Sequence, residues 1–95
     1  MSVSPLVSVT VCVRDGGHWV EDCLDSLLQQ THRPLEIIAV NDGSSDDTKS
    51  KLDTWYEKHG NGDVPIQIIH QDSLGLSAGR MAAVEKSSGT WIAIT

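Results

Sequence analysis

The chain has 95 residues, of which 7 are Lys or Arg and 13 are Asp or Glu, so its formal net charge is −6 at pH 7. A chain of this length forms at most one small domain. Its acidic balance, without any basic run, argues against binding to a nucleic-acid backbone or an anionic membrane. No stretch reaches the roughly 20 apolar residues that a membrane-spanning helix needs. We therefore expect a small-molecule partner and no nucleic acid.

The cysteines and the amino terminus bear on the compartment. Cys12 and Cys23 form no metal-ligand spacing with the four histidines, so we interpret both as reduced packing residues. Residues 1–5 have neither the charged region nor the apolar core of a signal peptide. These features predict a cytoplasmic protein that is neither exported nor anchored by itself.

The first half of the chain predicts two strands around one helix. Residues 7–13 are dense in β-branched side chains and end at the turn sequence Arg14–Gly17, which predicts a strand. Apolar residues between Trp19 and Leu28 recur at helical spacing, and Pro34 ends that helix. The expected stripe comprises Trp19, Val20, Cys23, Leu24, Leu27 and Leu28. The apolar run at 35–41 predicts a second, buried strand.

The second half continues the alternation. Ser44 or Ser45, followed by Asp46 and Asp47, suits the start of a second helix, because hydroxyls and acids accept hydrogen bonds from free amides there. Its inward face is expected to hold Thr48, Leu52, Trp55 and Tyr56. A third strand is predicted at 66–70, a third helix at 77–86 and a fourth strand at 91–94. The third helix should turn Ala78, Met81, Ala82 and Val84 inward.

Strands that alternate with helices predict an α/β fold with a Rossmann-like parallel sheet, flanked by helices and joined by right-handed crossovers. The sheet stops at its fourth strand, straight after an apolar run. We therefore interpret residues 1–95 as a single partial domain, the amino-terminal half of a larger one.

Asp42 is the leading candidate for a functional residue. It ends the second predicted strand and precedes Gly43, at the edge where an open α/β sheet has its ligand crevice. One interpretation is a turn residue that stabilises its own loop. The other is a carboxylate that accepts the imide N–H of uracil, or the N1–H and amino group of guanine.

Other motif types receive no support. Gly16 and Gly17 lack the remaining glycines of a dinucleotide fingerprint, and Gly75 and Gly79 precede the third helix instead of following the first strand. The tryptophans are expected in the core or an interface. The histidines share no ligand spacing and are assigned no chemistry; they are His18, His32, His59 and His70.

Several motifs in order resemble those of the inverting glycosyltransferases of family 2, which have a GT-A fold and use nucleotide-diphosphate sugars. The similarity runs from about residue 5 to residue 95. Residues 23–31, CLDSLLQQT, are similar to the family's CLxSLLxQT, and residues 36–48, EIIAVNDGSSDDT, to its EIIVVDDGSxDxT. Residues 75–80, GLSAGR, resemble GxxxAR, and residues 89–94, GTWIAI, resemble GEYIAFL.

The chain also departs from the family pattern. Asn41 replaces the first of two acids, and Met81 replaces a common asparagine. Residues 12–15, Cys-Val-Arg-Asp, stand where the family often has Pro-Thr-Tyr-Asn. The family's Asp-X-Asp, which binds Mg²⁺ or Mn²⁺ and the diphosphate, is expected beyond Thr95, and its catalytic base later still.

The resemblance implies roles for four residues. Asp42 would contact the nucleotide base, Asp15 and Arg80 would lie close to the nucleotide, and the backbone around Val13 would line the pocket. Asp15 could equally be a loop residue, and Arg80 an ordinary solvated cation. No catalytic or metal-binding residue is assigned to this chain, which alone is expected to bind no metal and to be inactive.

The resemblance also implies partners for the full-length enzyme. Its donor would be a UDP-, GDP- or dTDP-sugar and its acceptor a saccharide or lipid-linked molecule, at the cytoplasmic membrane face in polysaccharide biosynthesis. The family's strand order runs third, second, first, fourth. The strand at 91–94 would then be an uncovered edge, through which we expect the chain to self-associate.

Two alternatives come from other classes. A receiver-like signalling domain also alternates strands and helices, but only Asp15 and Asp72 fit its acidic positions. A non-catalytic α/β interaction domain is the other, and an Asp-X-Asp in a downstream sequence would argue against it.

Overall fold

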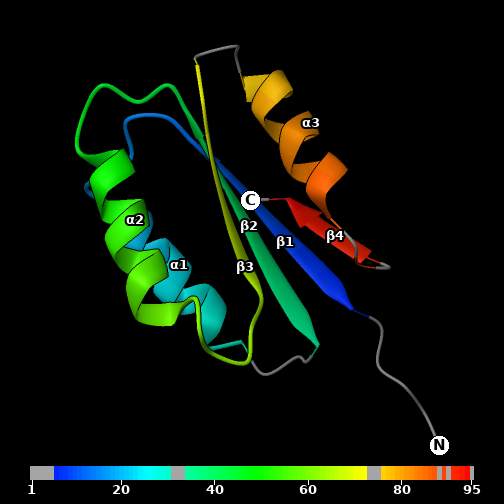
Figure 1. The fold of residues 1–95 in the computed structure, drawn as a ribbon. Helices are drawn as coiled ribbons and strands as arrows, with labels where there is room; N and C mark the ends of the chain where they lie inside the picture. Colours follow the sequence, from blue (N-terminus) through cyan, green and yellow to red (C-terminus); the bar gives the residue numbers. More distant parts are fainter. Residues whose placement is uncertain (1–5, 31–33, 73–75, 88, 90, 95) are drawn as a thin grey trace, which may run out of the picture.

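The computed structural model describes residues 6–30, 34–72, 76–87, 89 and 91–94. Strands and helices alternate along the chain, as the sequence predicts (Figure 1). The elements are β1 (Val7–Val13), α1 (Val20–Leu28), β2 (Leu35–Asp42), α2 (Thr48–His59), β3 (Ile66–Gln71), α3 (Leu76–Lys86) and β4 (Trp91–Ile94). No helix of this described part has the length and apolar character that a membrane span requires.

The strands form one parallel sheet in the order β3-β2-β1-β4. This confirms the predicted order and places β2 and β1 in the middle. A receiver-like domain would instead place β1 between β2 and β3, so the observed order argues against that alternative. The register opposes Val13 to Asn41 and Asn41 to His70, so the carboxyl ends of β1, β2 and β3 meet at one edge.

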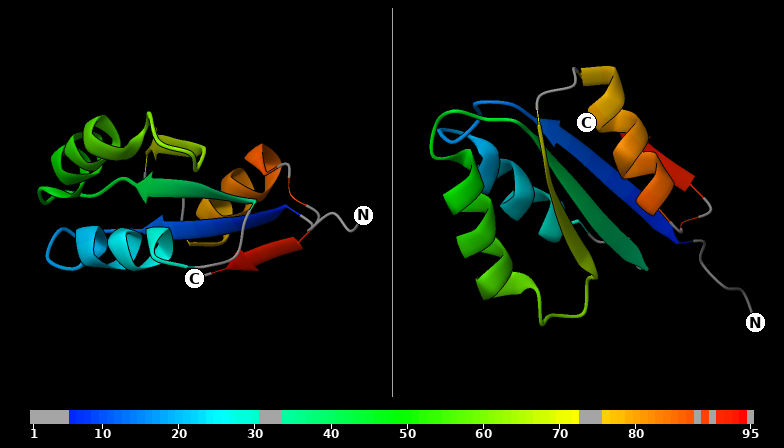
Figure 2. Two further views of the ribbon diagram at one scale, coloured as in Figure 1. Left: turned by 90° about the horizontal axis from the view of Figure 1, so that it is seen from below. Right: turned by 45° about the horizontal axis from the view of Figure 1, so that its top comes forward.

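The core has two parts because side chains alternate between the faces of a sheet. Helices α1 and α2 lie on one side and α3 on the other (Figure 2). The larger cluster includes Val9, Val11, Val13, Leu35, Ile37, Ala39 and Ile66 from the strands and Val20, Leu24, Leu52 and Trp55 from α1 and α2. The smaller cluster joins Ile38 and Val40 to Ala83 of α3.

The predicted inner face of α3 is partly wrong. Met81 and Val84 are 64% and 40% exposed, whereas Ala83 is fully buried. Ala78 and Ala82 are half-buried, as expected. Small alanine side chains let the helix backbone approach the sheet closely, and this orientation leaves Met81 and Val84 outside.

Two aromatic residues also differ from expectation. Trp19 is 40% exposed because it is the N-cap residue, with non-helical backbone angles of φ −136° and ψ −13°, and so does not lie on the helical stripe of α1. Tyr56 is 43% exposed, because its neighbour Trp55 takes the buried position and donates a hydrogen bond from Nε1 to Asp25 Oδ1 at 2.9 Å. The side chain of Trp91 lies outside the described part of the structure.

Candidate functional site

Asp42 occupies the position that the sequence predicts, as the last residue of β2. Its side chain is only 2% exposed, and Oδ1 accepts a hydrogen bond from Gln71 Nε2 at 3.0 Å. Gly43 follows at once with φ 67°, a left-handed conformation that favours glycine. The chain therefore turns immediately after a buried carboxylate that the neighbouring strand holds in place.

A cleft of about 450 Å³ opens beside Asp42, at the carboxyl ends of β2 and β3. It is lined by Asn41, Gly43, Ser44, Lys49, His70, Gln71 and Asp72. Gly43 is the chain neighbour of Asp42 and Gln71 is its hydrogen-bond partner. Asp42 itself does not line the cleft. The wall presents amide, hydroxyl and charged side chains, a chemistry suited to a polar ligand.

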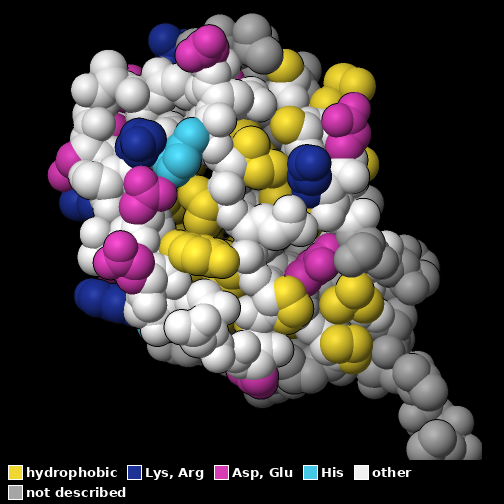
Figure 3. Space-filling view, in the orientation of Figure 1, with side chains coloured by type: hydrophobic (Ala, Val, Ile, Leu, Met, Phe, Trp, Pro, Cys, Tyr) yellow, Lys and Arg dark blue, Asp and Glu magenta, His cyan; other side chains and the backbone are white. Residues whose placement is uncertain are grey.

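A second cleft, of about 640 Å³, lies between α2 and β3. Figure 3 shows this hollow with hydrophobic side chains on its floor and charged side chains on its rim. Its lining residues are Asp53, Tyr56, Glu57, Ile66, Gln67, Ile68 and His70. It lies along the side of β3 and shares His70 with the first cleft, and none of the residues that the sequence singled out as candidates lines it.

Asp15 joins the loop after β1 to the loop after β2. Its Oδ1 accepts hydrogen bonds from the Ser45 amide at 2.7 Å, the Ser45 hydroxyl at 3.3 Å and the Asp46 amide at 3.3 Å. Its own amide donates to Ser44 Oγ at 2.9 Å. Asp15 has φ 54°, which an aspartate tolerates better than most residues. This geometry supports the loop role, and a contact with the nucleotide stays a prediction.

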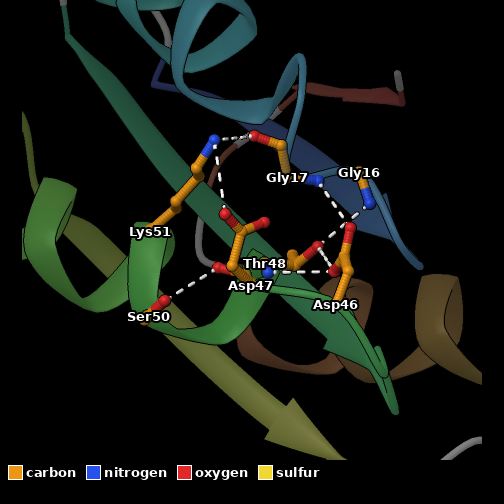
Figure 4. A network of polar contacts seen from close by, with 7 residues as sticks. All are labelled: Gly16, Gly17, Asp46, Asp47, Thr48, Ser50 and Lys51. Carbon is orange, nitrogen blue, oxygen red and sulfur yellow. Dashed lines mark hydrogen bonds and ion pairs between the residues drawn. The ribbon is translucent and has the colours of Figure 1, made fainter.

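Asp46 forms a second bridge between the same loops (Figure 4). Its Oδ2 accepts from the Gly17 amide at 3.1 Å, and its Oδ1 accepts from the Thr48 amide at 2.9 Å and from the Thr48 hydroxyl. Thr48 Oγ1 in turn accepts from the Gly16 amide at 3.0 Å. Lys51 Nζ donates to the Gly17 carbonyl at 2.6 Å. Side chains from α2 therefore hold the turn that follows β1.

These contacts change the ionisation of Asp46. The Thr48 hydroxyl, then the Thr48 amide and the Gly17 amide, hold the pKa of the Asp46 carboxyl below its ordinary value of 3.8. Hydrogen bonds to the charged form favour that form. A carboxyl whose pKa is lower in the folded state stabilises the protein above pH 3.8. This contribution is lost as the pH falls through the pKa of the folded state.

Asp46→Asn is therefore expected to lower the melting temperature at about pH 7, with the gap to the unmodified protein narrowing once the pH falls below 3.8. Thermal unfolding followed by circular dichroism across this range measures the gap. Glu85→Gln, at an exposed position of α3, is the matched control and should show no such gap. A gap that stays constant down to about pH 3 would contradict the assigned role.

Val13 and Arg80 are the remaining sequence candidates. Val13 ends β1 and is 1% exposed, with its side chain in the larger core cluster. Its side chain is therefore packed in the core, and a role for its backbone in lining the pocket stays a prediction. Arg80 lies within α3, and its side chain is outside the described part of the structure. Its proximity to a nucleotide stays a prediction.

Metal binding was not assigned to this chain. Among the described residues, no group of three or more His, Cys, Asp or Glu side chains is placed to hold a metal ion. Cys12 and Cys23 are both free thiols. Burial raises the pKa of the Cys23 thiol, which disfavours the thiolate that a metal site or a nucleophile needs.

Three site residues, Asn41, His70 and Gln71, received no role from the sequence. His70 Nδ1 lies 3.1 Å from Asn41 Nδ2, and His70 Nε2 lies 2.8 Å from Asp53 Oδ1. Spacing along the chain could not reveal these contacts, because they depend on how β3 is aligned with β2. The alignment places the carboxyl ends of β2 and β3 side by side.

Comparison with known proteins supports the fold and the family. The family model described as glycosyl transferase family 2 matches residues 8–95. The mannosyltransferase PcManGT from Pyrobaculum calidifontis, solved in complex with GDP-Man and Mn²⁺, has a similar fold, with a TM-score of 0.86 over 96% of this chain and 27% of that chain. Its sequence is 23% identical, so this likeness concerns the fold.

Curated relatives are similar over most of this chain. The uncharacterized glycosyltransferase EpsJ of Bacillus subtilis is 38% identical over 93% of this chain and 24% of its own length. Glycosyltransferase GlyA of Streptococcus pneumoniae is 34% identical over 97% of this chain and 13% of its own length. The chain thus spans about a quarter or less of these relatives. The match over residues 8–95 nevertheless covers nearly the whole sequence, and the chain belongs to glycosyltransferase family 2.

Proposed function

We propose that residues 1–95 form the nucleotide-binding part of a larger glycosyltransferase, which transfers a sugar from a nucleotide-diphosphate donor to an acceptor hydroxyl. The observation that carries this proposal is the buried carboxylate of Asp42 at the carboxyl end of β2, beside a polar cleft. Open α/β sheets bind ligands at this edge. Family membership argues against a non-catalytic interaction domain.

Asp42 would accept the N–H donors of a uracil or guanine ring. Gln71, whose amide donates to Asp42 Oδ1 at 3.0 Å, would fix the direction of that carboxylate. A base without such donors could not form these hydrogen bonds, which count for more in a desolvated site than in water. The donor would therefore be a UDP-, GDP- or dTDP-sugar; PcManGT is a neighbour solved with GDP-Man.

A divalent metal, Mg²⁺ or Mn²⁺, would supply charge neutralisation at the donor diphosphate in the complete enzyme. We propose that an Asp-X-Asp outside residues 1–95 holds it, because the sequence of residues 1–95 contains no Asp-X-Asp. The acceptor would be a saccharide or a lipid-linked molecule, used in polysaccharide biosynthesis at the cytoplasmic membrane face. Self-association through the outer edge of β4, the last strand in the sheet order, also stays a prediction.

The proposal predicts that residues 1–95 bind nucleotide but transfer no sugar. Binding needs the cleft, whereas transfer needs a metal site and a base that we place in the longer protein. Radiolabelled transfer from UDP- and GDP-sugars, with and without Mn²⁺, compares residues 1–95 with the full-length protein. Sustained metal-dependent transfer by residues 1–95 would contradict this division of roles.

A further inference from the structure

The last two residues of β3 each contact one of the last two residues of β2. The register pairs Asn41 with His70 and Asp42 with Gln71. Gln71 Nε2 donates to Asp42 Oδ1 at 3.0 Å, and Asn41 Nδ2 lies 3.1 Å from His70 Nδ1. Strand β3 therefore supports both side chains at the margin of the proposed nucleotide cleft.

The orientation of the Asn41 amide fixes the tautomer of His70. The Ser44 backbone N–H can only donate, so the Asn41 atom that faces it at 3.2 Å must be the amide oxygen. The amide nitrogen of Asn41 then faces His70 Nδ1, which has to accept. The imidazole proton is left on Nε2, which donates to Asp53 Oδ1 at 2.8 Å. His70 is thus neutral in this arrangement.

We propose that His70 is a positioning residue for the nucleotide site, holding Asn41 and the loop after Asp42 only while its imidazole is neutral. This inference rests on the proposed function. Protonation would place an N–H on Nδ1 opposite the amide N–H groups of Asn41. The amide would then rotate to offer its oxygen to His70, and the Ser44 N–H would lose its acceptor. Because Gly43 and Ser44 directly follow Asp42, the loosened loop changes the setting of the base-binding carboxylate.

The charged groups around His70 are compatible with a role that depends on its protonation state. From α2, Asp53 keeps its hydrogen bond to Nε2 in both protonation states, and Lys49 Nζ lies 4.0 Å from Asp53 Oδ2. Glu57 of α2 lines the outer cleft together with His70. From the strand ends, Asp72 lines the nucleotide cleft together with His70, and Asp42 accepts a hydrogen bond from Gln71, the residue after His70. Histidine is the side chain that most often serves as a pH switch, so pH is the variable that tests this role.

Nucleotide affinity at two pH values tests the proposal. Calorimetry with UDP and GDP on the full-length protein should show affinity falling roughly three- to tenfold between about pH 8 and about pH 5.5, the effect of losing one hydrogen bond. In His70→Gln, Oε1 can accept from Asn41 and Nε2 can donate to Asp53 at every pH. At both pH values this variant should keep the affinity that the unmodified protein has at about pH 8. Its binding should therefore lack the pH dependence that comes from His70.

Two further variants complete the comparison. His70→Ala removes the support and should weaken binding at both pH values. His59→Gln is the matched control, because His59 lies at the opposite end of α2, beside Trp55 at 4.9 Å between ring centroids, and it should follow the unmodified protein. Protonation of the nucleotide's own phosphates is common to all variants and cancels in the comparison.

A second readout needs no nucleotide. Nitrogen-15 NMR should find the Nε2–H tautomer of His70 at about pH 8 and a Ser44 amide signal that titrates with His70, but not in His70→Gln. If the unmodified protein and His70→Gln show the same pH dependence of binding, or if the Ser44 signal does not change with His70, the positioning role is overturned and the proposed function still stands. Absence of nucleotide binding at both pH values overturns the proposed function, and the positioning role with it.

Discussion

Asp42→Ala is expected to weaken the binding of UDP or GDP by roughly 1–3 kcal/mol, the range for loss of a hydrogen bond to a charged group. The carboxylate is 2% exposed, so water replaces it poorly as an acceptor for the base. Its removal also takes away the oxygen that accepts the hydrogen bond from Gln71 Nε2. Calorimetry on the full-length protein measures the change.

The control for this variant is Asp22→Ala, which changes an exposed acid of α1 outside both clefts and should leave affinity unchanged. Circular dichroism of both variants checks that the fold is retained. Asp42→Asn adds a sharper comparison, because it keeps the size of the side chain and replaces one acceptor oxygen with a donor. Unchanged affinity of Asp42→Ala for both nucleotides would refute the base-binding role.

Ile37→Ala is expected to lower the free energy of unfolding by about 2–5 kcal/mol, the range for deleting buried methyl groups from a core. Ile37 is fully buried in β2, where it is paired with Val9 of β1 and Ile66 of β3. It belongs to the cluster that packs α1 and α2 on the sheet. Small domains are stable by only about 5–15 kcal/mol, so much of that stability would be lost.

Urea unfolding followed by tryptophan fluorescence measures this loss, and Trp55 in the same cluster is a suitable reporter. Val84→Ala is the matched control, since Val84 is 40% exposed on α3 and should change stability by no more than about 0.5 kcal/mol. A loss below about 1 kcal/mol for Ile37→Ala would show that this part of the core repacks around the cavity.

The sheet was predictable from the sequence because its signals are local. Every residue of β2 is buried, and its continuous apolar run marks a strand that is covered on both faces. The apolar residues end at Val40, and β2 continues for two polar residues to Asp42, one residue beyond the predicted strand at 35–41. The strand order came from the family resemblance and is confirmed by the pairing.

Contacts between distant segments were not predictable. Asp15 lies 29–31 positions from the loop residues it binds, and His70 lies 29 from Asn41. Such pairs depend on the alignment of strands and on loop conformation, which periodicity does not encode. The side of α3 that packs on the sheet was also predicted incorrectly. Met81 and Val84 lie at helical spacing, but the small Ala83 is the residue that packs on the sheet.

The central claim, that a nucleotide base binds at the carboxyl end of β2, is tested most directly by NMR mapping with UDP, GDP and CDP on the ¹⁵N-labelled protein. The account predicts that UDP or GDP shifts the amide signals of Asp42, Gly43, Ser44 and Gln71, that CDP shifts them less because cytosine lacks the imide N–H, and that Asp42→Ala abolishes the difference. Shifts confined to the outer cleft between α2 and β3, or equal shifts with all three nucleotides, would contradict it.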